Sequence, residues 1–245
     1  MSKKKVKIIS FDLDGTLVDF EFNELVWHQG IPEKYAEKHN LDFESARGRV
    51  RAEYDRVTDG GLSWYDIRHW FNFFGLPGTH DELFERFRHS IRTFPEVKEV
   101  MKKLQGMGYE MVLTTNSSRE FLTIELQETG LAPYFSRIFS ATSDFRMVKK
   151  VPEFYRQILG LLGTDEKSVI HVGDHWKFDY LAPREAGIES YFVDRKSERE
   201  PSREEGIIQD LSELLKILKD SPKPSVRSPK PKKKSFKVGS GNFSL

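Results

Sequence analysis

Residues 5–19, KVKIISFDLDGTLVD, form the stretch from which the fold is predicted. Its first half, from Val6 to Phe11, is almost wholly apolar, as expected of a strand in a parallel sheet with helices on both faces. Asp12 and Asp14 follow directly, and Gly15 permits a tight turn after them. Open α/β sheets bind ligands at the carboxyl ends of their strands, which is where we expect these two carboxylates.

These two carboxylates need a partner for their charge. Like charges that share a site repel each other, so a cation or a shared proton must hold Asp12 and Asp14 together. Oxygen ligands of this kind suit Mg²⁺, which keeps several waters and takes one or two carboxylates together with substrate phosphate. The alternative is a strand end closed by a polar turn, because Asp-x-Asp-Gly also occurs by chance and in calcium loops.

The composition favours a cytoplasmic α/β protein with a smaller second module. The 245 residues, 38% of them apolar and 13% aromatic, suffice for a core. The absence of Cys excludes disulfides, zinc–thiolate sites and thiol nucleophiles. No apolar run approaches the roughly 20 residues of a membrane span, and MSKKKVK leads straight into a strand, so we expect no membrane partner.

The net charge of +1 conceals an acidic body and a basic tail. Seven of the 39 Lys and Arg residues lie from Ser221 onward, where there is no Asp or Glu. The remainder has 32 basic and 38 acidic residues, a formal charge of about −6. The tail, residues 221–245, has no apolar period and is expected to be disordered. Its charge leaves contact with nucleic acid open, although a solvated extension is the simpler interpretation.

Helical patterns over residues 20–91 interrupt the α/β pattern after the first loop. Most of their aromatic side chains are expected in a core of their own, whereas side chains facing the loop would contact substrate. The predicted first residues or N-caps of five helices are Phe22, Pro32, Asp42 or Ser45, Ser63 and Asp81. The candidates for contact with substrate, among which the sequence does not choose, are His28, Arg47, Arg51, Trp64, Tyr65, Arg68 and His69.

Two later segments offer groups that could bind phosphate. Thr115 and Asn116 follow an apolar strand at 109–114, and a hydroxyl with N–H groups opening the next helix could donate to phosphoryl oxygens. The same residues also form an ordinary N-cap cluster. Lys149 and Lys150 precede another predicted helix, where two cations are unfavourable for the helix dipole. An ammonium close to the leading carboxylates would instead offset their repulsion.

A third segment offers further metal ligands. The apolar strand 168–172 is followed by Asp174, and by Asp179 five residues later. Asp174 can reach a metal at the sheet edge, and Asp179 can ligate it or orient the site, although an ordinary Asp N-cap is the alternative. Further strands are expected at 137–139 and 190–193, and a final amphipathic helix at 207–218.

Taken in order, these four segments resemble the four motifs of the haloacid dehalogenase (HAD) superfamily, over Val6 to about Leu218. The resemblance implies an α/β fold, a three-layer α/β/α Rossmann-like parallel sheet, with a helical cap of the C1 type inserted after the first strand. It implies a core domain of residues 1–19 and 92–220 and a cap domain of residues 20–91.

The resemblance also implies a Mg²⁺-dependent phosphatase that acts on a small phosphorylated metabolite. Asp12 would attack phosphorus and form an aspartyl-phosphate, while Asp14 would act first as general acid and then as general base. The implied metal site comprises Asp12, the backbone carbonyl of Asp14, and Asp174, with Asp179 in support. The implied phosphate-binding residues are Thr115, Asn116 and Lys149, the last favoured over Lys150 because it fits the motif's spacing.

Two other functions stay open at this stage. A phosphomutase keeps the same motifs and transfers the phosphoryl group to a sugar hydroxyl instead of water. A non-catalytic binding protein on this scaffold would be expected to have lost an acid at position 12, 14 or 174, and all are present. Dehalogenases of this fold carry Tyr where this chain has Asp14, which favours the phosphatase.

Overall fold

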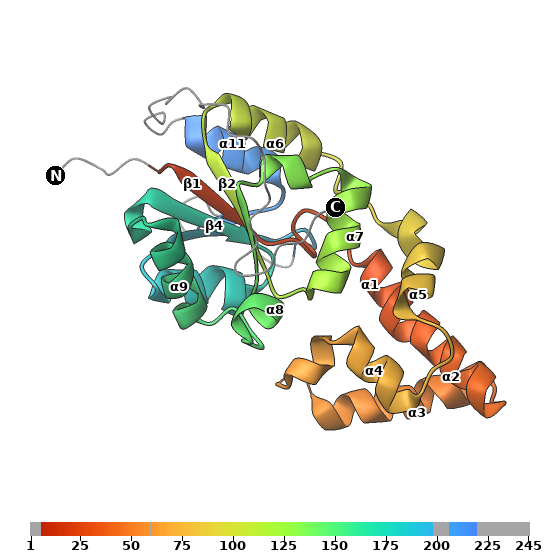
Figure 1. The fold of residues 1–245 in the computed structure, drawn as a ribbon. Helices are drawn as coiled ribbons and strands as arrows, with labels where there is room; N and C mark the ends of the chain where they lie inside the picture. The colour runs from red at the N-terminus through yellow and green to blue at the C-terminus, as the bar shows by residue number, and fades with distance from the viewer. Residues whose placement is uncertain (1–5, 59, 198–205, 220–245) are drawn as a thin grey trace.

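The computed structural model describes residues 6–58, 60–197 and 206–219, in an α/β part and a helical insertion (Figure 1). The tail at 221–245, predicted to be disordered, lies outside the described residues. The α/β part has one sheet of six parallel strands in the order β3-β2-β1-β4-β5-β6, so β1 lies between β2 and β4. The strands are β1 (Ile8–Phe11), β2 (Glu110–Thr115), β3 (Arg137–Ser140), β4 (Val169–Gly173), β5 (Glu189–Val193) and β6 (Ile207–Ile208).

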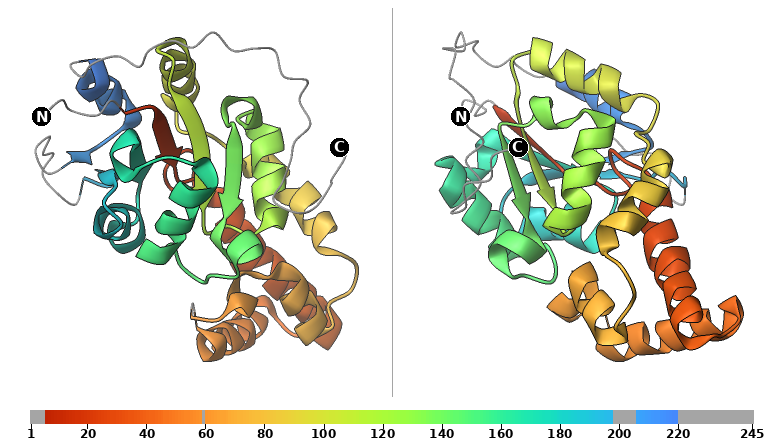
Figure 2. Two further views of the ribbon diagram at one scale, coloured as in Figure 1. Left: turned by 60° about the vertical axis from the view of Figure 1, so that its left-hand side comes forward. Right: turned by 45° about the vertical axis from the view of Figure 1, so that its right-hand side comes forward.

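Helices cover both faces of this sheet, which confirms the predicted three layers (Figure 2). Ile9 and Phe11 pack with α6 and α11 on one face, while Ile8 packs with α9 and α10 on the other. This alternation gives each strand two apolar faces, as a fully covered parallel sheet requires. The helices of this part are α6 (Val97–Gly106), α7 (Arg119–Thr129), α8 (Ala141–Phe145), α9 (Pro152–Leu162), α10 (Ala182–Glu185) and α11 (Leu211–Lys219).

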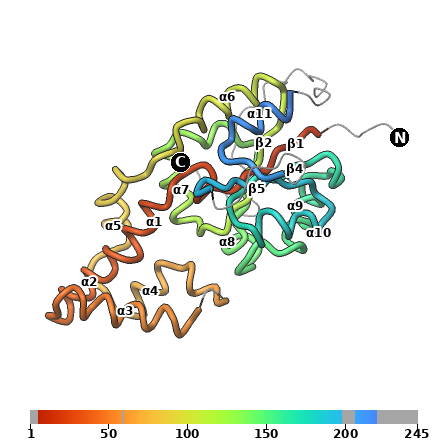
Figure 3. The backbone as a smooth tube through the Cα atoms, turned by 180° about the vertical axis from the view of Figure 1, so that it is seen from behind, coloured from red at the N-terminus to blue at the C-terminus, as the bar shows by residue number. Residues whose placement is uncertain are grey.

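The helical insertion, residues 20–91, projects from the carboxyl end of β1 and contacts α7 (Figure 3). The Asp42 side chain accepts the Ser45 N–H, so Asp42 is the N-cap of its helix. No described helix is long and apolar enough to cross a membrane. The insertion comprises α1 (Glu21–Leu25), the π-helical segment η1 (Val26–Gly30), α2 (Ile31–His39), α3 (Phe43–Val57), η2 (Leu62–Tyr65), α4 (Ile67–Phe74), α5 (His80–Phe87) and η3 (Arg88–Ser90).

The predicted helix break before Pro32 is wrong, because α1, η1 and α2 continue as one helix. Proline lacks an N–H and cannot make the usual helical hydrogen bond, and a π-helical segment is one way for a helix to continue past it. Gly30 does not end the helix either. A Cβ at Gly30 would lie 2.8 Å from the Phe87 ring, so glycine allows α5 to approach closely.

The last strand is also missing from the sequence prediction, which assigns Ile207 to a helix. Ile207 and Ile208 instead pair in parallel with β5, and α11 begins only at Leu211. The hydrogen bonding of β5 explains why these residues form a strand, because the Asp194 N–H donates to the Ile208 carbonyl. Two apolar residues next to an amphipathic helix resemble its first turn in sequence.

Candidate active site

A cavity of about 390 Å³ lies between the carboxyl ends of the strands and the helical insertion. Ligand sites of open parallel sheets occupy this position. The residues of the sheet side that line the cavity include Asp12, Asp14, Asn116, Lys150, Asp174 and Asp179, so four predicted segments meet here.

The loop after β1 is folded tightly around one carbonyl oxygen. The N–H groups of Leu17 and Val18 both donate to the Leu13 carbonyl, at 2.8 and 3.1 Å. Gly15 has a φ of +76°, and a Cβ there would lie 2.1 Å from Asp174 Oδ2, so no other residue fits. Arg195 Nε donates to the Gly15 carbonyl at 3.1 Å and fixes the loop from outside. No sequence motif indicated this role for Arg195.

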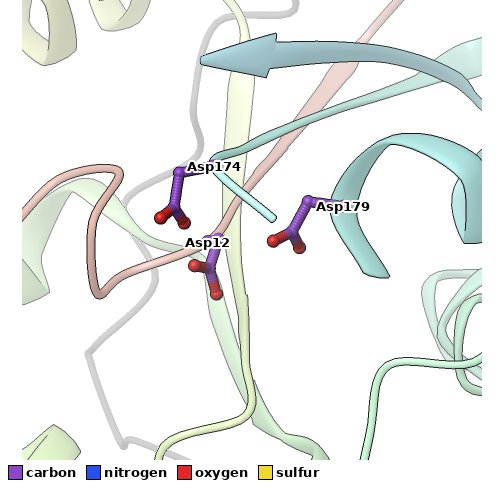
Figure 4. A group of neighbouring side chains, drawn as sticks. All are labelled: Asp12, Asp174 and Asp179. Carbon is purple, nitrogen blue, oxygen red and sulfur yellow. The ribbon is translucent and has the colours of Figure 1, made fainter. Parts of the chain in front are cut away.

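Three of the predicted metal ligands come together. Asp12 follows β1, Asp174 follows β4, and Asp179 lies in the π-helical segment η6 (Trp176–Leu181). Figure 4 shows their carboxyl groups gathered, and one oxygen of each lies within 4.8 Å of the others. Thr16 Oγ1 donates to Asp174 Oδ1 at 3.2 Å and orients it. The Asp14 side chain is not part of this carboxylate triad.

Lys150, not Lys149, is the lysine of the triad, which corrects the sequence preference. Its Nζ contacts Asp12 Oδ1, lies 2.5 Å from Asp179 Oδ1, and the residue is 3% exposed. Lys149 lines the cavity with Nζ 5.4 Å from the centre of the Phe178 ring. Lys150, and not Lys149, reaches the triad because the chain makes a tight turn here. In this turn the Val151 N–H donates to the Lys149 carbonyl at 2.8 Å. Spacing along the chain does not reveal this turn.

The triad carries more negative charge than Lys150 balances. Burial raises the pKa of Asp12 well above its usual range and that of Asp174 to about 7. Burial works against the charged form of Asp179 too, but Lys150 and then His171 outweigh it and lower the pKa of that carboxyl. Uncompensated carboxylate oxygens in a buried site are the donor set of a hard divalent cation, so these residues fit Mg²⁺.

Asp14 and Glu125 form a second, separate pair of carboxyl groups. Asn23 Nδ2 donates both to Asp14 Oδ1, at 2.9 Å, and to Glu125 Oε1, at 2.8 Å. Glu125, from α7, is fully buried, and burial followed by the charge of Asp14 raises its pKa well above the usual range. Asn23 comes from α1, so the helical insertion supplies the donor that holds Asp14. The sequence analysis singled out neither Asn23 nor Glu125. An acid at position 125 is nevertheless a signal, because it stands among Phe121, Leu122 and Leu126 on the apolar side of the helix.

The segment after β2 supplies buried polar atoms at the cavity. Asn116 and Ser118 line it, and Asn116 Oδ1 and Ser118 Oγ are buried without a hydrogen-bond partner in the described part of the chain. Such atoms are rare in proteins and indicate a place for a ligand. Thr115 is 1% exposed, and its hydroxyl accepts the Ser117 N–H at 3.0 Å, so it shapes the turn.

A buried network beneath the triad holds Asp179 in place. His171 Nε2 lies 2.9 Å from Asp179 Oδ1, while His171 Nδ1 lies 2.9 Å from Ser10 Oγ. The Tyr155 hydroxyl lies 3.1 Å from the same His171 Nε2. Burial lowers the pKa of His171, which favours the uncharged imidazole. The side chain of Asp179 is therefore held on its far side by the His171 ring, which Ser10 and Tyr155 contact in turn.

The insertion side of the cavity is aromatic. Of the seven candidates there, His28, Trp64 and Tyr65 line the cavity. Trp27 and Tyr54 line it as well, and the Trp27 ring stacks on Phe121 of α7 at 5.2 Å. The other four candidates make contacts elsewhere: Arg47 with Glu44, Arg51 with Asp55, Arg68 with Glu120, and His69 with Phe73.

Comparisons with known proteins find relatives over most of the chain. A family model described as haloacid dehalogenase-like hydrolase matches residues 6–187. Haloacid dehalogenase-like hydrolase domain-containing protein 3 of Danio rerio is 31% identical over 178 residues, 68% of this chain and 71% of that protein. Phosphoglycolate phosphatase of Vibrio parahaemolyticus is 27% identical over 234 residues, 89% of this chain and 98% of that protein.

Solved structures show the same fold. The crystal structure of a HAD phosphatase from Thermococcus onnurineus matches with a TM-score of 0.76 and 25% identity, over 87% of this chain and 98% of that one. A 2-haloacid dehalogenase from Pseudomonas syringae matches with a TM-score of 0.63 and 23% identity, over 88% of this chain and 99% of that one. The second likeness concerns the fold alone.

Proposed function

Because the chain belongs to the haloacid dehalogenase-like hydrolase family, we propose that it is a Mg²⁺-dependent phosphatase that hydrolyses a small phosphomonoester through an aspartyl-phosphate on Asp12. The relatives named as phosphatases support the reaction class. The observation that carries the proposal is the pair of separate acid groups. One is the triad with Lys150, and the other is Asp14 held by Asn23 beside Glu125.

The two leading acids divide the chemistry between them. A carboxylate oxygen of Asp12 attacks phosphorus, and the bond from phosphorus to the ester oxygen breaks. Asp14 gives its proton to that oxygen, and then takes a proton from the water that splits the bond between Asp12 and phosphorus. Burial raises the pKa of Asp14, which favours the protonated carboxyl group that a general acid needs.

The metal would be held by Asp12, Asp174 and the backbone carbonyl of Asp14, with Asp179 in support. When bound, Mg²⁺ supplies positive charge that lowers the repulsion between an anionic nucleophile and the phosphate. Lys150 keeps Asp12 and Asp179 in place. The unpartnered Ser118 hydroxyl can donate to a phosphoryl oxygen, and the Nδ2 group of Asn116 is a second possible donor at the cavity, while Thr115 contributes the turn that presents them.

We further propose that residues 20–91 act as a C1 cap over a core domain of residues 1–19 and 92–220. Their side chains close one side of the cavity and would keep bulk water from the aspartyl-phosphate. A cytoplasmic location stays a prediction from the composition.

The direct test is Mg²⁺-dependent release of phosphate from para-nitrophenyl phosphate. We expect activity that chelation removes, and a loss of about a thousandfold or more in the Asp12→Asn variant, because the nucleophile is gone. Asp55→Asn is the matched control, since Asp55 is exposed on the insertion and pairs with Arg51. Equal activity in Asp12→Asn and the native chain would contradict the assignment of the nucleophile.

A further inference from the structure

We propose that the leaving group of the substrate carries a flat aromatic ring, either a nucleobase or a simple arene, and no second anionic group. This inference rests on the phosphatase function proposed above and deepens it by naming the substrate class. It comes from the chemistry of the half of the cavity that faces away from the triad.

That half offers ring surfaces. Trp27, Tyr54, Trp64 and Tyr65 line it from the insertion, and Phe121 lines it from α7. These rings support one another, because Trp27 stacks on Phe121 with an interplanar angle of 17°, and Trp64 meets Tyr54 edge-on at 5.5 Å. Rings held in this way bind another flat ring at little cost in side-chain freedom.

The same half lacks a strong cation. Among the described residues, no Lys or Arg of the insertion lines the cavity, and Arg68 is paired with Glu120 at 2.8 Å. His28 is the basic side chain there, and it lies 3.7 Å from Glu24. A carboxylate or second phosphate on a leaving group among these rings would meet no Lys or Arg of the insertion. Lys149, the lysine of the lining outside the triad, belongs to the core and lies beside Phe178. This disfavours substrates such as 2-phosphoglycolate and pyrophosphate.

The size of the cavity agrees with a ring-bearing ester. Its volume of about 390 Å³ falls within the range of small-molecule sites, roughly 300–1,000 Å³. Asp12 and Lys150 line it from the core, and Trp64 and Tyr65 line it from the insertion. A phosphoryl group at Asp12 therefore leaves space for a leaving group among the rings.

The test compares esters of matched reactivity, using the full chain with Mg²⁺. Benzyl phosphate and cyclohexylmethyl phosphate have the same charge and similar size, and both release a primary alcohol. We expect kcat/KM to be about tenfold higher for the benzyl ester, the scale of one stacking contact. Nucleoside 5′-monophosphates against ribose 5-phosphate form the second pair, which tells a nucleobase from a simple arene.

A matched pair of variants locates the effect. Trp64→Leu should reduce the preference for benzyl over cyclohexylmethyl phosphate to about twofold or less, mainly through KM. Phe73→Leu, on the exposed side of α4 and outside the cavity lining, should leave the preference unchanged. As a gain of function, His28→Arg should raise kcat/KM for 2-phosphoglycolate relative to benzyl phosphate.

The two proposals fail in different ways. Phosphate release from all esters alike, with equal rates for the two matched pairs, would overturn the aromatic leaving group and keep the phosphatase. A native chain that prefers 2-phosphoglycolate to benzyl phosphate would overturn it as well. No release from any ester, or release that Asp12→Asn retains, would count against the phosphatase itself.

Discussion

The two sides of the cavity are built on different principles. On the sheet side, charged groups occupy fixed positions at strand ends, and each has a partner that orients it, such as Thr16 for Asp174 and His171 for Asp179. On the insertion side, aromatic rings that hold one another make up most of the lining, with Asn23 and His28 beside them. In the function proposed above, the sheet side carries the chemistry common to phosphate esters, and the insertion side selects the alcohol.

Removing the buried cation should show the sheet side at its most sensitive. Lys150→Met leaves three carboxylates without their ammonium, so we expect kcat/KM to fall by about a hundredfold or more. Lys149→Met is the matched control and should cost about tenfold or less, because its ammonium faces Phe178. Steady-state kinetics of the two variants, with a circular dichroism check of folding, would measure the difference. A larger loss of kcat/KM in Lys149→Met than in Lys150→Met would support Lys149, the lysine that the sequence analysis favoured.

A methyl group in the first loop should show how closely the sheet side is packed. Gly15→Ala places a Cβ against Asp174 at a positive φ, so we expect kcat to fall about tenfold or more. Gly130→Ala has a similar φ, +67°, and meets nothing within 4 Å. It should cost about 1 kcal/mol of folding free energy and leave kcat unchanged. Similar kinetics in the two variants would mean that the loop tolerates displacement.

Removing the Asn23 amide, which joins the insertion to Asp14 and Glu125 of the core, should have an intermediate effect on kcat. Asn23→Leu removes the amide that donates to Asp14 and Glu125, so we expect kcat to fall about tenfold with a smaller change in KM. Asn72→Leu, on an exposed position of α4, is the control. A change in KM alone would show that Asn23 serves binding and does not position the acid.

The surface contact between the two sides should matter least. Arg68→Gln removes an exposed ion pair with Glu120, and exposed pairs contribute about 0.2–1 kcal/mol. We expect KM to change by about twofold or less, and the change to disappear at high salt. Arg47→Gln, whose pair with Glu44 lies within the insertion, should have no effect on KM. A salt-independent change in the Arg68 variant would indicate a direct contact with substrate.

The sequence predicted the sheet side better than the insertion side. Apolar runs followed by acids identify β1 and β4, because a covered parallel strand has no polar face and its ligands follow it at once. Asp12, Asp174 and Asp179 accordingly met as expected. The choice between Lys149 and Lys150 depended on one backbone hydrogen bond, which neither spacing nor composition encodes.

The insertion side was predicted less well because its contacts join residues that are far apart in the sequence. An aromatic residue at helical spacing can equally face the insertion's own core, as Trp70 does, or the cavity, as Trp64 does. Asn23 and Glu125 lie 102 positions apart and have no motif in common. Their meeting follows from how the insertion packs on α7, which one sequence does not reveal.

Helix α7 has a consequence for exchanging parts between related enzymes. It belongs to the core in sequence, yet two of its residues one turn apart contact the insertion. The Phe121 ring stacks on Trp27, and the Glu125 carboxyl group accepts a hydrogen bond from Asn23. An insertion transplanted onto a foreign core would lose both of these partners. The transferable unit is thus the insertion together with α7, and a chimera that carries the two segments keeps the acid–amide contact and the ring stack intact.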